Sequence, residues 1–154
     1  MFKIIPLVTA IACGPAELET SSVKDTQATI VEELPTQFGV ISSEDCSQSQ
    51  PGDTVCNLVL YDQNKEPWQL YDHRNKIVVL DFSTSWCPPC QNAGMFVQPI
   101  QDDYGDELVF ATLLVDGYTP GVEPTDDEII DWVESHNITT APVLYASRDL
   151  VFDP

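Results

Sequence analysis

Val79-Leu80-Asp81-Phe82-Ser83-Thr84-Ser85-Trp86-Cys87-Pro88-Pro89-Cys90 is the stretch that decides the fold of this chain. It continues an apolar run that starts at Ile77, and it ends in a Cys-x-x-Cys motif. Such a motif, placed where a buried strand turns into a helix, indicates a dithiol/disulfide redox pair. Two intervening residues bring the sulfurs within bonding reach on the first helical turn. Cys87 then lies at the helix N-terminus, where unpaired N–H groups and the helix dipole favour a thiolate.

The composition argues against two classes of partner. The chain has 154 residues, and 25 Asp and Glu against six Lys and Arg give a formal charge of −19. Nucleic-acid binding needs a basic patch for phosphate contacts, and the sequence shows none. The same charge disfavours docking on anionic membrane surfaces. The hydrophobic content of 43% is enough for one domain with a core of ordinary size, plus a tail.

The N-terminus has the pattern of an export signal. Lys3 precedes a short apolar stretch, Ile4–Ala12, that ends in small residues. Ala10-Ile11-Ala12-Cys13 is similar to a bacterial lipobox, in which cleavage exposes a cysteine that receives a lipid. We therefore predict a signal peptide over residues 1–12 and lipidation at Cys13. The alternatives are a plain secretory signal and a cytosolic protein with an apolar start, and the stretch is too short to span a membrane.

A polar, acidic segment separates this signal from the part that folds. Residues 13–37 are poor in aromatic side chains and cannot bury enough apolar area to order themselves. They predict a flexible tether between a lipid anchor and a domain over residues 38–154. Together these features predict a periplasmic or cell-envelope lipoprotein that meets the membrane only through its anchor.

Apolar runs and turn residues predict a hairpin followed by a core strand. Val55–Tyr61 predicts a strand, residues 62–65 supply turn chemistry, and Trp68–Tyr71 predicts the returning strand. Ile77–Phe82 is a continuous apolar run broken only by Asp81. Such a run is typical of a central strand covered on both faces.

Helices and strands alternate after the cysteine motif. Cys90–Asp102 predicts a helix that Pro99 kinks or ends, and Leu108–Val115 predicts a second buried strand. Thr125-Asp126-Asp127-Glu128 is a capping box that opens another helix, and Val143–Tyr145 predicts a third strand. The apolar residues at helical spacing are Met95, Phe96 and Ile100 in the first helix, and Ile129, Ile130 and Val133 in the second. This order implies an α/β fold with a mainly parallel sheet and the cysteines at the C-terminal end of its first strand.

The segment from Val79 to Cys90 resembles the strand and active site of the thioredoxin superfamily. The hairpin before it and the helical insert after the second strand are similar to the membrane-tethered TlpA/ResA type, over residues 52–150. The resemblance implies that Cys87 is the attacking thiolate and Cys90 the resolving thiol. It also implies that Asp81 is a buried carboxylate that moves protons to and from Cys90. Trp86 and Pro88 would contact the substrate.

The end of the chain departs from the resemblance. The superfamily has a cis-proline loop facing the cysteines, followed by a hairpin and a last helix. Thr140-Ala141-Pro142-Val143 is superficially similar to that loop, but the residues after Pro142 look more like the strand that follows the inserted helix. We favour the second interpretation. It predicts that the thioredoxin-like domain is incomplete at the C-terminus.

The other cysteines fit an exported protein. Cys46 and Cys56 flank a turn-rich loop and predict a structural disulfide, with two free buried thiols as the alternative for a cytosolic protein. A zinc site would recruit further ligands to the Cys87 pair from these two cysteines, His73 or His136, but no second closely spaced pair exists. We therefore predict no metal. The two histidines are more typical of surface or dipole-pairing residues.

The resemblance implies thiol–disulfide exchange with the disulfides of exported proteins. A membrane thiol reductase would supply electrons, and no cofactor is needed. A peroxiredoxin-like peroxide reductase stays open, because Thr84-Ser85-Trp86-Cys87 fits the Thr-x-x-Cys spacing, although Cys90 favours exchange. A non-catalytic lipoprotein or binding module is the third possibility.

Overall fold

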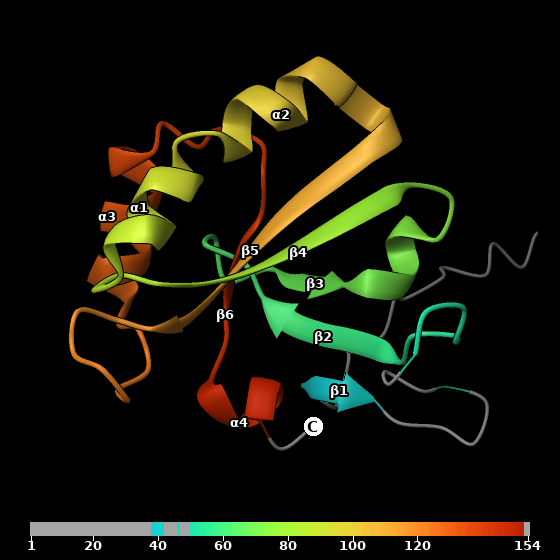
Figure 1. Cartoon of the computed structure of the whole chain (residues 1–154), viewed down its shortest axis with the longest axis horizontal. Helices are drawn as coiled ribbons and strands as arrows, with labels where there is room; N and C mark the ends of the chain where they lie inside the picture. Colours follow the sequence, from blue (N-terminus) through green and yellow to red (C-terminus); the bar gives the residue numbers. More distant parts are fainter. Residues whose placement is uncertain (1–37, 42–45, 47–49, 153–154) are drawn as a thin grey trace, which may run out of the picture. The chain divides into compact units, whose positions relative to one another are not determined.

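The computed structural model describes residues 38–41, 46 and 50–152. The predicted signal peptide and the whole predicted tether, including Cys13, lie outside these residues. In chain order the elements are β1 (Gly39–Ile41), β2 (Asn57–Tyr61), β3 (Pro67–Gln69), the 3-10 helix η1 (Leu70–His73), β4 (Ile77–Thr84), α1 (Pro88–Gly94), α2 (Val97–Tyr104), the 3-10 helix η2 (Gly105–Glu107), β5 (Leu108–Asp116), α3 (Asp126–Ser135), β6 (Val143–Tyr145) and α4 (Arg148–Phe152). Figure 1 shows them along the chain.

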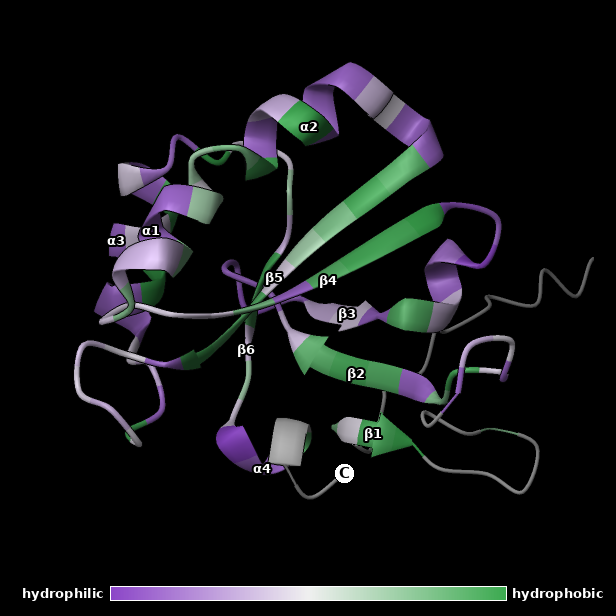
Figure 2. Cartoon of the chain, in the orientation of Figure 1, coloured by the Kyte–Doolittle hydropathy of each residue, from purple (hydrophilic) through white to green (hydrophobic). Residues whose placement is uncertain are grey.

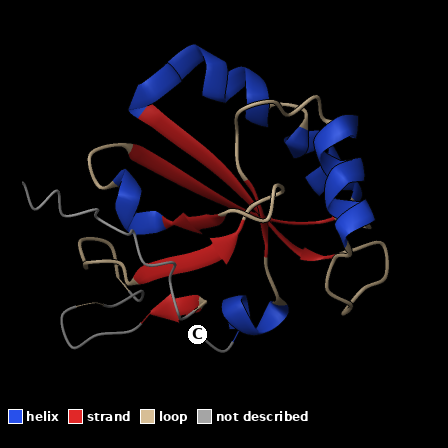
Figure 3. Cartoon of the chain, turned by 180° about the vertical axis from the view of Figure 1, so that it is seen from behind, coloured by secondary structure: helices blue, strands red, loops and turns tan. Residues whose placement is uncertain are grey.

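The strands form two small sheets. β1, β2 and β3 are antiparallel neighbours, and β4, β5 and β6 form a parallel sheet with β5 in the middle. Figure 3 shows the long β4 and β5 side by side from behind, with the helices at the periphery. The predicted hairpin, parallel sheet and helical insert between β5 and β6 are confirmed. The described part therefore has the thioredoxin-like α/β fold that the sequence predicted.

Alternate side chains of β5 fill two hydrophobic clusters, one on each face of the parallel sheet. One face, with Ala111 and Leu113, packs against β2 and β3. The opposite face, with Leu114, packs against α2 and α3 through Val97, Ile129 and Trp132, among others. Figure 2 shows the apolar residues concentrated in β2, β4 and β5. Burial on both faces explains why β5 is apolar along nearly its whole length.

β4 is not the central strand that its apolar run predicted. Within the described residues it pairs only with β5, so it forms one edge of the parallel sheet. Ile77 is 60% exposed and Phe82 46%. A continuous apolar run does not tell a central strand from an edge strand, because the pattern of apolar residues carries no information about which strands lie beside it. β5 has the same kind of run and is the strand that occupies the centre.

Pro99 lies in the first turn of a helix, although it was expected to kink or end one. The predicted helix divides into α1 and α2, with the break at Met95 and Phe96. Pro99 is the third residue of α2, where its missing N–H costs nothing because first-turn N–H groups have no partner within the helix. Both residues at the break are more than half exposed, so they do not form a buried helix face with Ile100. Val97 is buried instead.

The capping box of α3 is confirmed. The Thr125 hydroxyl accepts from the Glu128 N–H, and the Glu128 carboxylate accepts from the Thr125 N–H. The helical spacing of Ile129, Ile130 and Val133 does not put all three side chains in the core. Ile129 and Trp132 are buried, whereas Ile130 is 48% exposed, because positions three apart share a helix face and adjacent positions do not.

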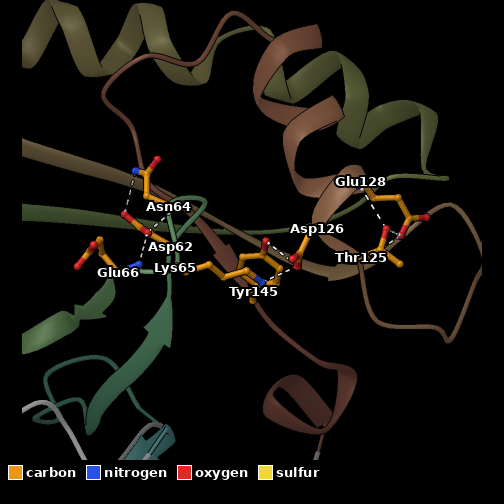
Figure 4. A network of polar contacts seen from close by, with 8 residues as sticks. All are labelled: Asp62, Asn64, Lys65, Glu66, Thr125, Asp126, Glu128 and Tyr145. Atoms are coloured by element: carbon orange, nitrogen blue, oxygen red, sulfur yellow. Dashed lines mark hydrogen bonds and ion pairs between the residues drawn. The ribbon is translucent and has the colours of Figure 1, made fainter.

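The predicted turn at residues 62–65 is confirmed, and its tip joins three elements. The Asp62 carboxylate accepts from backbone N–H groups of Asn64 and Glu66, at 2.8 and 2.9 Å. Lys65 lies at the tip of the turn, and its Nζ is 2.5 Å from an Asp126 oxygen and 3.6 Å from the ring centre of Tyr145 (Figure 4). The hairpin is thereby tied to the start of α3 and to β6. The returning strand is shorter than predicted, because residues 70 and 71 belong to η1.

Pro142 leads directly into β6, as the favoured interpretation expected. Its carbonyl accepts from the Thr112 N–H at 3.0 Å, and β6 pairs with β5 on the side away from β4. The described residues contain no cis peptide bond. The segment is therefore a strand of the parallel sheet and not a loop placed over the cysteines.

Candidate active site

Cys87 and Cys90 are joined by a disulfide at the start of α1, with their Cα atoms 5.2 Å apart. Cys87 is the N-cap residue, and its sulfur accepts from the Cys90 N–H at 3.3 Å. Pro88 and Pro89 occupy the first two helical positions and have no N–H to offer. The Cys90 N–H is therefore the first-turn donor that faces the Cys87 sulfur. Both cysteines are half-buried, and Cys90 packs against the cluster under α2 and α3.

Backbone hydrogen bonds fix the turn between β4 and α1. The Ser85 N–H donates to the Asp116 carbonyl at 3.1 Å, and the Cys87 N–H donates to the Thr84 carbonyl at 3.3 Å. The Gln91 side chain closes the turn by donating to the Ser85 carbonyl at 2.8 Å. The cysteines are thus presented at the C-terminal end of β4, the edge where parallel sheets place their sites.

Asp81 is half-buried, which is more open than the buried carboxylate that the resemblance implies. Its carboxylate accepts from the Ser83 hydroxyl at 2.7 Å. It stands opposite Thr112 in the register with β5. Within the described residues β4 is an edge strand, so no second strand pairs with it on the side away from β5.

Asp116 organises the other side of the site, and the sequence analysis missed it. It ends β5 and is fully buried. Its carboxylate accepts from the Trp86 indole N–H at 3.0 Å, from the Gly121 N–H at 3.0 Å, and from the Arg148 guanidinium. These donors, above all Arg148, hold the pKa of Asp116 well below its usual range although burial acts in the opposite direction. In the sequence, the one sign of its role is that an acidic residue ends an otherwise apolar strand.

Trp86 and Pro88 are exposed beside the sulfurs. Trp86 keeps 44% of its surface accessible while its indole nitrogen is anchored to Asp116. Pro88 is exposed at the start of α1. Tyr118 and Val122, in the loop that follows Asp116, are also more than half exposed.

His136 is buried at the C-terminal end of α3, so of its two predicted placements the one at the surface was wrong and the one paired with the helix end fits. Its ring is 3% exposed and lies against Trp132, with ring centres 4.2 Å apart. Nδ1 lies 2.8 Å from the Trp132 carbonyl oxygen, and Nε2 lies 3.1 Å from the Gln91 carbonyl oxygen. The ring therefore joins the end of α3 to α1. A Cβ atom at Gly94 would lie 2.5 Å from this ring, which is why that position has no side chain.

The remaining candidate residues lie away from the redox pair. Cys46 and Cys56 are joined by a disulfide, with their Cα atoms 4.9 Å apart. His73 stacks on Trp68, with ring centres 5.2 Å apart, and burial together with Lys76 lowers the pKa of His73. No group of three or more His, Cys, Asp or Glu suited to a metal occurs in the described part of the chain. Within those same ranges, no helix has the length and apolar character needed to cross a membrane.

Two proteins of known identity are similar to this chain in sequence. Thioredoxin H2 of Arabidopsis thaliana is 31% identical over 117 residues, which cover 71% of this chain and 74% of that protein. A thioredoxin of Chlorobaculum thiosulfatiphilum is 40% identical over 42 residues, or 27% of this chain and 39% of that protein. No protein-family model matches the chain.

Solved structures show the same fold at low sequence identity. A secreted disulfide oxidoreductase of Mycobacterium tuberculosis, homologous to E. coli DsbE, has a TM-score of 0.51 at 15% identity, over 62% of this chain and 64% of that one. The thioredoxin domain of a thiol-disulfide oxidoreductase from Bacteroides vulgatus has a TM-score of 0.51 at 15% identity, over 63% and 64%. The chain thus spans less than two thirds of these structures.

Proposed function

This chain belongs to the thioredoxin family, and from that membership we propose that it is a thiol–disulfide oxidoreductase acting on exported proteins. The observation that carries the proposal is the Cys87–Cys90 disulfide at the start of α1, at the C-terminal end of β4. A structural disulfide would have no need of a half-buried position beside exposed apolar side chains. The family and the geometry therefore support the same chemistry.

The proposed reaction is a two-step thiol–disulfide exchange, and neither step uses a cofactor. The reduced Cys87 thiolate attacks one sulfur of a substrate disulfide, which forms a mixed disulfide and releases one substrate thiolate. Cys90 then attacks the Cys87 sulfur, which releases the second substrate thiol and leaves the Cys87–Cys90 disulfide seen here. An external dithiol restores the reduced pair by the reverse sequence.

We assign roles to three further residues. Asp81, a half-buried carboxylate on the strand that leads into the cysteine turn, takes the proton that Cys90 must lose before it attacks. Trp86 and Pro88 contact the substrate through their exposed surfaces. Support for these roles comes from the family resemblance and, for Trp86 and Pro88, from their exposed positions next to Cys87 in the chain.

The proposed setting is the cell envelope. The Mycobacterium tuberculosis structure with the same fold is described as secreted, and the Cys46–Cys56 disulfide suits an oxidising compartment. We propose that lipidation at Cys13 anchors the chain and that a membrane thiol reductase keeps the pair reduced. Substrates would be disulfides of other exported proteins.

Reduction of insulin by dithiothreitol tests the activity. We expect the chain to accelerate insulin precipitation and Cys87→Ser to remove the acceleration. Cys90→Ser should accumulate a mixed disulfide, because the second step lacks its nucleophile. The control is Cys46→Ser with Cys56→Ser, which removes the other disulfide and should leave the rate within about twofold if the domain stays folded. Equal rates for wild type and Cys87→Ser would refute the proposal, as would hydrogen peroxide consumption without insulin reduction.

A further inference from the structure

We infer that Arg148 is a positioning residue for the redox pair: it holds the Asp116 carboxylate, which in turn holds the Trp86 indole beside Cys87. The inference rests on the proposed function, because it assigns a part in that reaction to a residue of α4. Arg148 lies 58 positions beyond the second cysteine of the motif, so no local pattern connects them.

The contacts form one continuous chain. Arg148 Nε lies 2.8 Å and 3.0 Å from the two Asp116 carboxylate oxygens, and Nη2 also donates to Oδ2. The same Oδ2 accepts from the Trp86 indole N–H at 3.0 Å. Trp86 is covalently linked to Cys87. Two hydrogen-bonded steps therefore connect the Arg148 guanidinium to the residue next to the attacking sulfur.

Asp116 ties two segments together through both its backbone and its side chain. The carbonyl accepts from the Ser85 N–H, and Oδ2 accepts from the Gly121 N–H as well as from Trp86. The turn before the cysteines and the loop at residues 117–124 thus meet at one residue. A shift of this carboxylate would move Trp86 relative to the redox pair.

Arg148 supplies the positive charge that stabilises the ionised Asp116 carboxylate in this network. The Asp116 side chain is fully buried, and a buried carboxylate without a counter-charge is strongly disfavoured. Among the described residues, Arg148 is the only cation that forms an ion pair with it. A guanidinium presents several donors in a fixed plane, which a lysine ammonium does not match. Arg148 itself is 45% exposed, so its own desolvation cost is small.

A structural salt bridge and a positioning residue predict different results. Removing a bridge that only adds stability would lower the unfolding midpoint but leave the folded site unchanged. A positioning residue changes the site at temperatures where the protein is fully folded. Because Arg148 is inferred to act through Asp116, its effect should also disappear when the Asp116 charge is removed.

The test is a double-mutant cycle on Arg148→Met and Asp116→Asn, read by insulin reduction on folded protein at 25 °C. We expect Arg148→Met to lower kcat/KM about tenfold in the wild-type background and to have less than about a twofold effect in the Asp116→Asn background. Arg148→Lys should restore part of the rate. Arg74→Met is the matched control, because Arg74 stacks on Tyr71, which is not part of the network.

A spectroscopic readout follows Trp86 directly. The fluorescence difference between oxidised and reduced protein is assigned to Trp86 by subtracting the same difference for Trp86→Phe. We expect Arg148→Met to lose most of this signal and Arg74→Met to keep it. If Arg148→Met does not fold, the pair Asp116→Asn and Asp116→Asn with Arg148→Met, together with Arg148→Lys, still decides the question.

Three results would overturn the inference. The first is that Arg148→Met keeps the wild-type kcat/KM and the wild-type Trp86 fluorescence difference. The second is that Arg148→Met lowers kcat/KM equally in the wild-type and Asp116→Asn backgrounds. The third is that Arg148→Lys is no more active than Arg148→Met. A wild-type chain with no insulin reduction would instead refute the proposed function, and the Trp86 fluorescence difference would still report whether Arg148 positions the indole.

Discussion

Cys87 shows how few backbone donors surround the candidate nucleophile. The two prolines that follow it carry no N–H, so the Cys90 N–H is left to face the sulfur at 3.3 Å. The exposed Trp86 and Pro88 then provide apolar surface on either side. At the scale of single residues, the sequence motif and the contacts in the structure describe the same site.

Asp81 carries a prediction at this scale. We expect Asp81→Asn to slow the release of substrate from the Cys87 mixed disulfide by about tenfold or more, because the amide cannot take the Cys90 proton. The rate at which the mixed disulfide forms should change little. Stopped-flow mixing with a peptide disulfide separates the two steps. Asp72→Asn, an exposed carboxylate in η1, is the control. Equal release rates for Asp81→Asn and wild type would remove Asp81 from the mechanism.

At the scale of elements, the contact between α1 and α3 keeps the redox helix in place. His136 bridges the two helices through the Gln91 carbonyl, and its ring fills the space above Gly94. Neither residue takes part in the proposed chemistry. Their role is to fix the helix that presents the cysteines.

Substitution at Gly94 tests this contact. Replacing glycine with alanine inside a helix normally stabilises the helix by about 1 kcal/mol. Here we expect Gly94→Ala to destabilise the protein by about 1–3 kcal/mol, because its Cβ would lie 2.5 Å from the His136 ring. Urea unfolding measures the difference. Asn92→Ala, exposed on the same helix, should be neutral or stabilising. A stabilised Gly94→Ala would show that the two helices are not in contact here.

At the scale of the whole molecule, charge sets the response to acid. The pKa values of Asp116 and Glu128 are held below their usual range by hydrogen bonds, chiefly from Arg148 and from backbone N–H groups, respectively. A carboxyl with a lower pKa in the folded state stabilises the fold above its unfolded pKa of about 4, and this stabilisation is lost as the pH falls through the folded value. Protonation also relieves the repulsion from a formal charge of −19, which acts in the opposite direction.

Comparison of variants separates these two effects. We expect the free energy of unfolding of the wild type to fall between pH 5 and pH 2.5, and that of Asp116→Asn to fall less over the same range. Urea unfolding at fixed ionic strength measures both slopes. Because one residue hardly alters the overall repulsion, a difference in slope reports Asp116 itself. Parallel slopes would contradict the low pKa of Asp116.

The sequence alone determined the features that are written locally in the chain. The strand before Cys87, the capping box at Thr125, the turn at residues 62–65 and the strand at residues 143–145 all follow from short-range patterns of apolar, capping and turn residues. The cysteine motif and its family followed in the same way, because a Trp-Cys-x-Pro-Cys core directly after an apolar strand is itself a local pattern.

Only the tertiary structure decided which residues meet. It placed β5 at the centre of the sheet and β4 at its described edge, because pairing partners are not encoded in the periodicity of a strand. It buried His136 against α1, and it brought Arg148, Asp116 and Trp86 together from three separate segments. Buried polar groups must find partners wherever the fold supplies them, so their positions depend on long-range packing that no local pattern records.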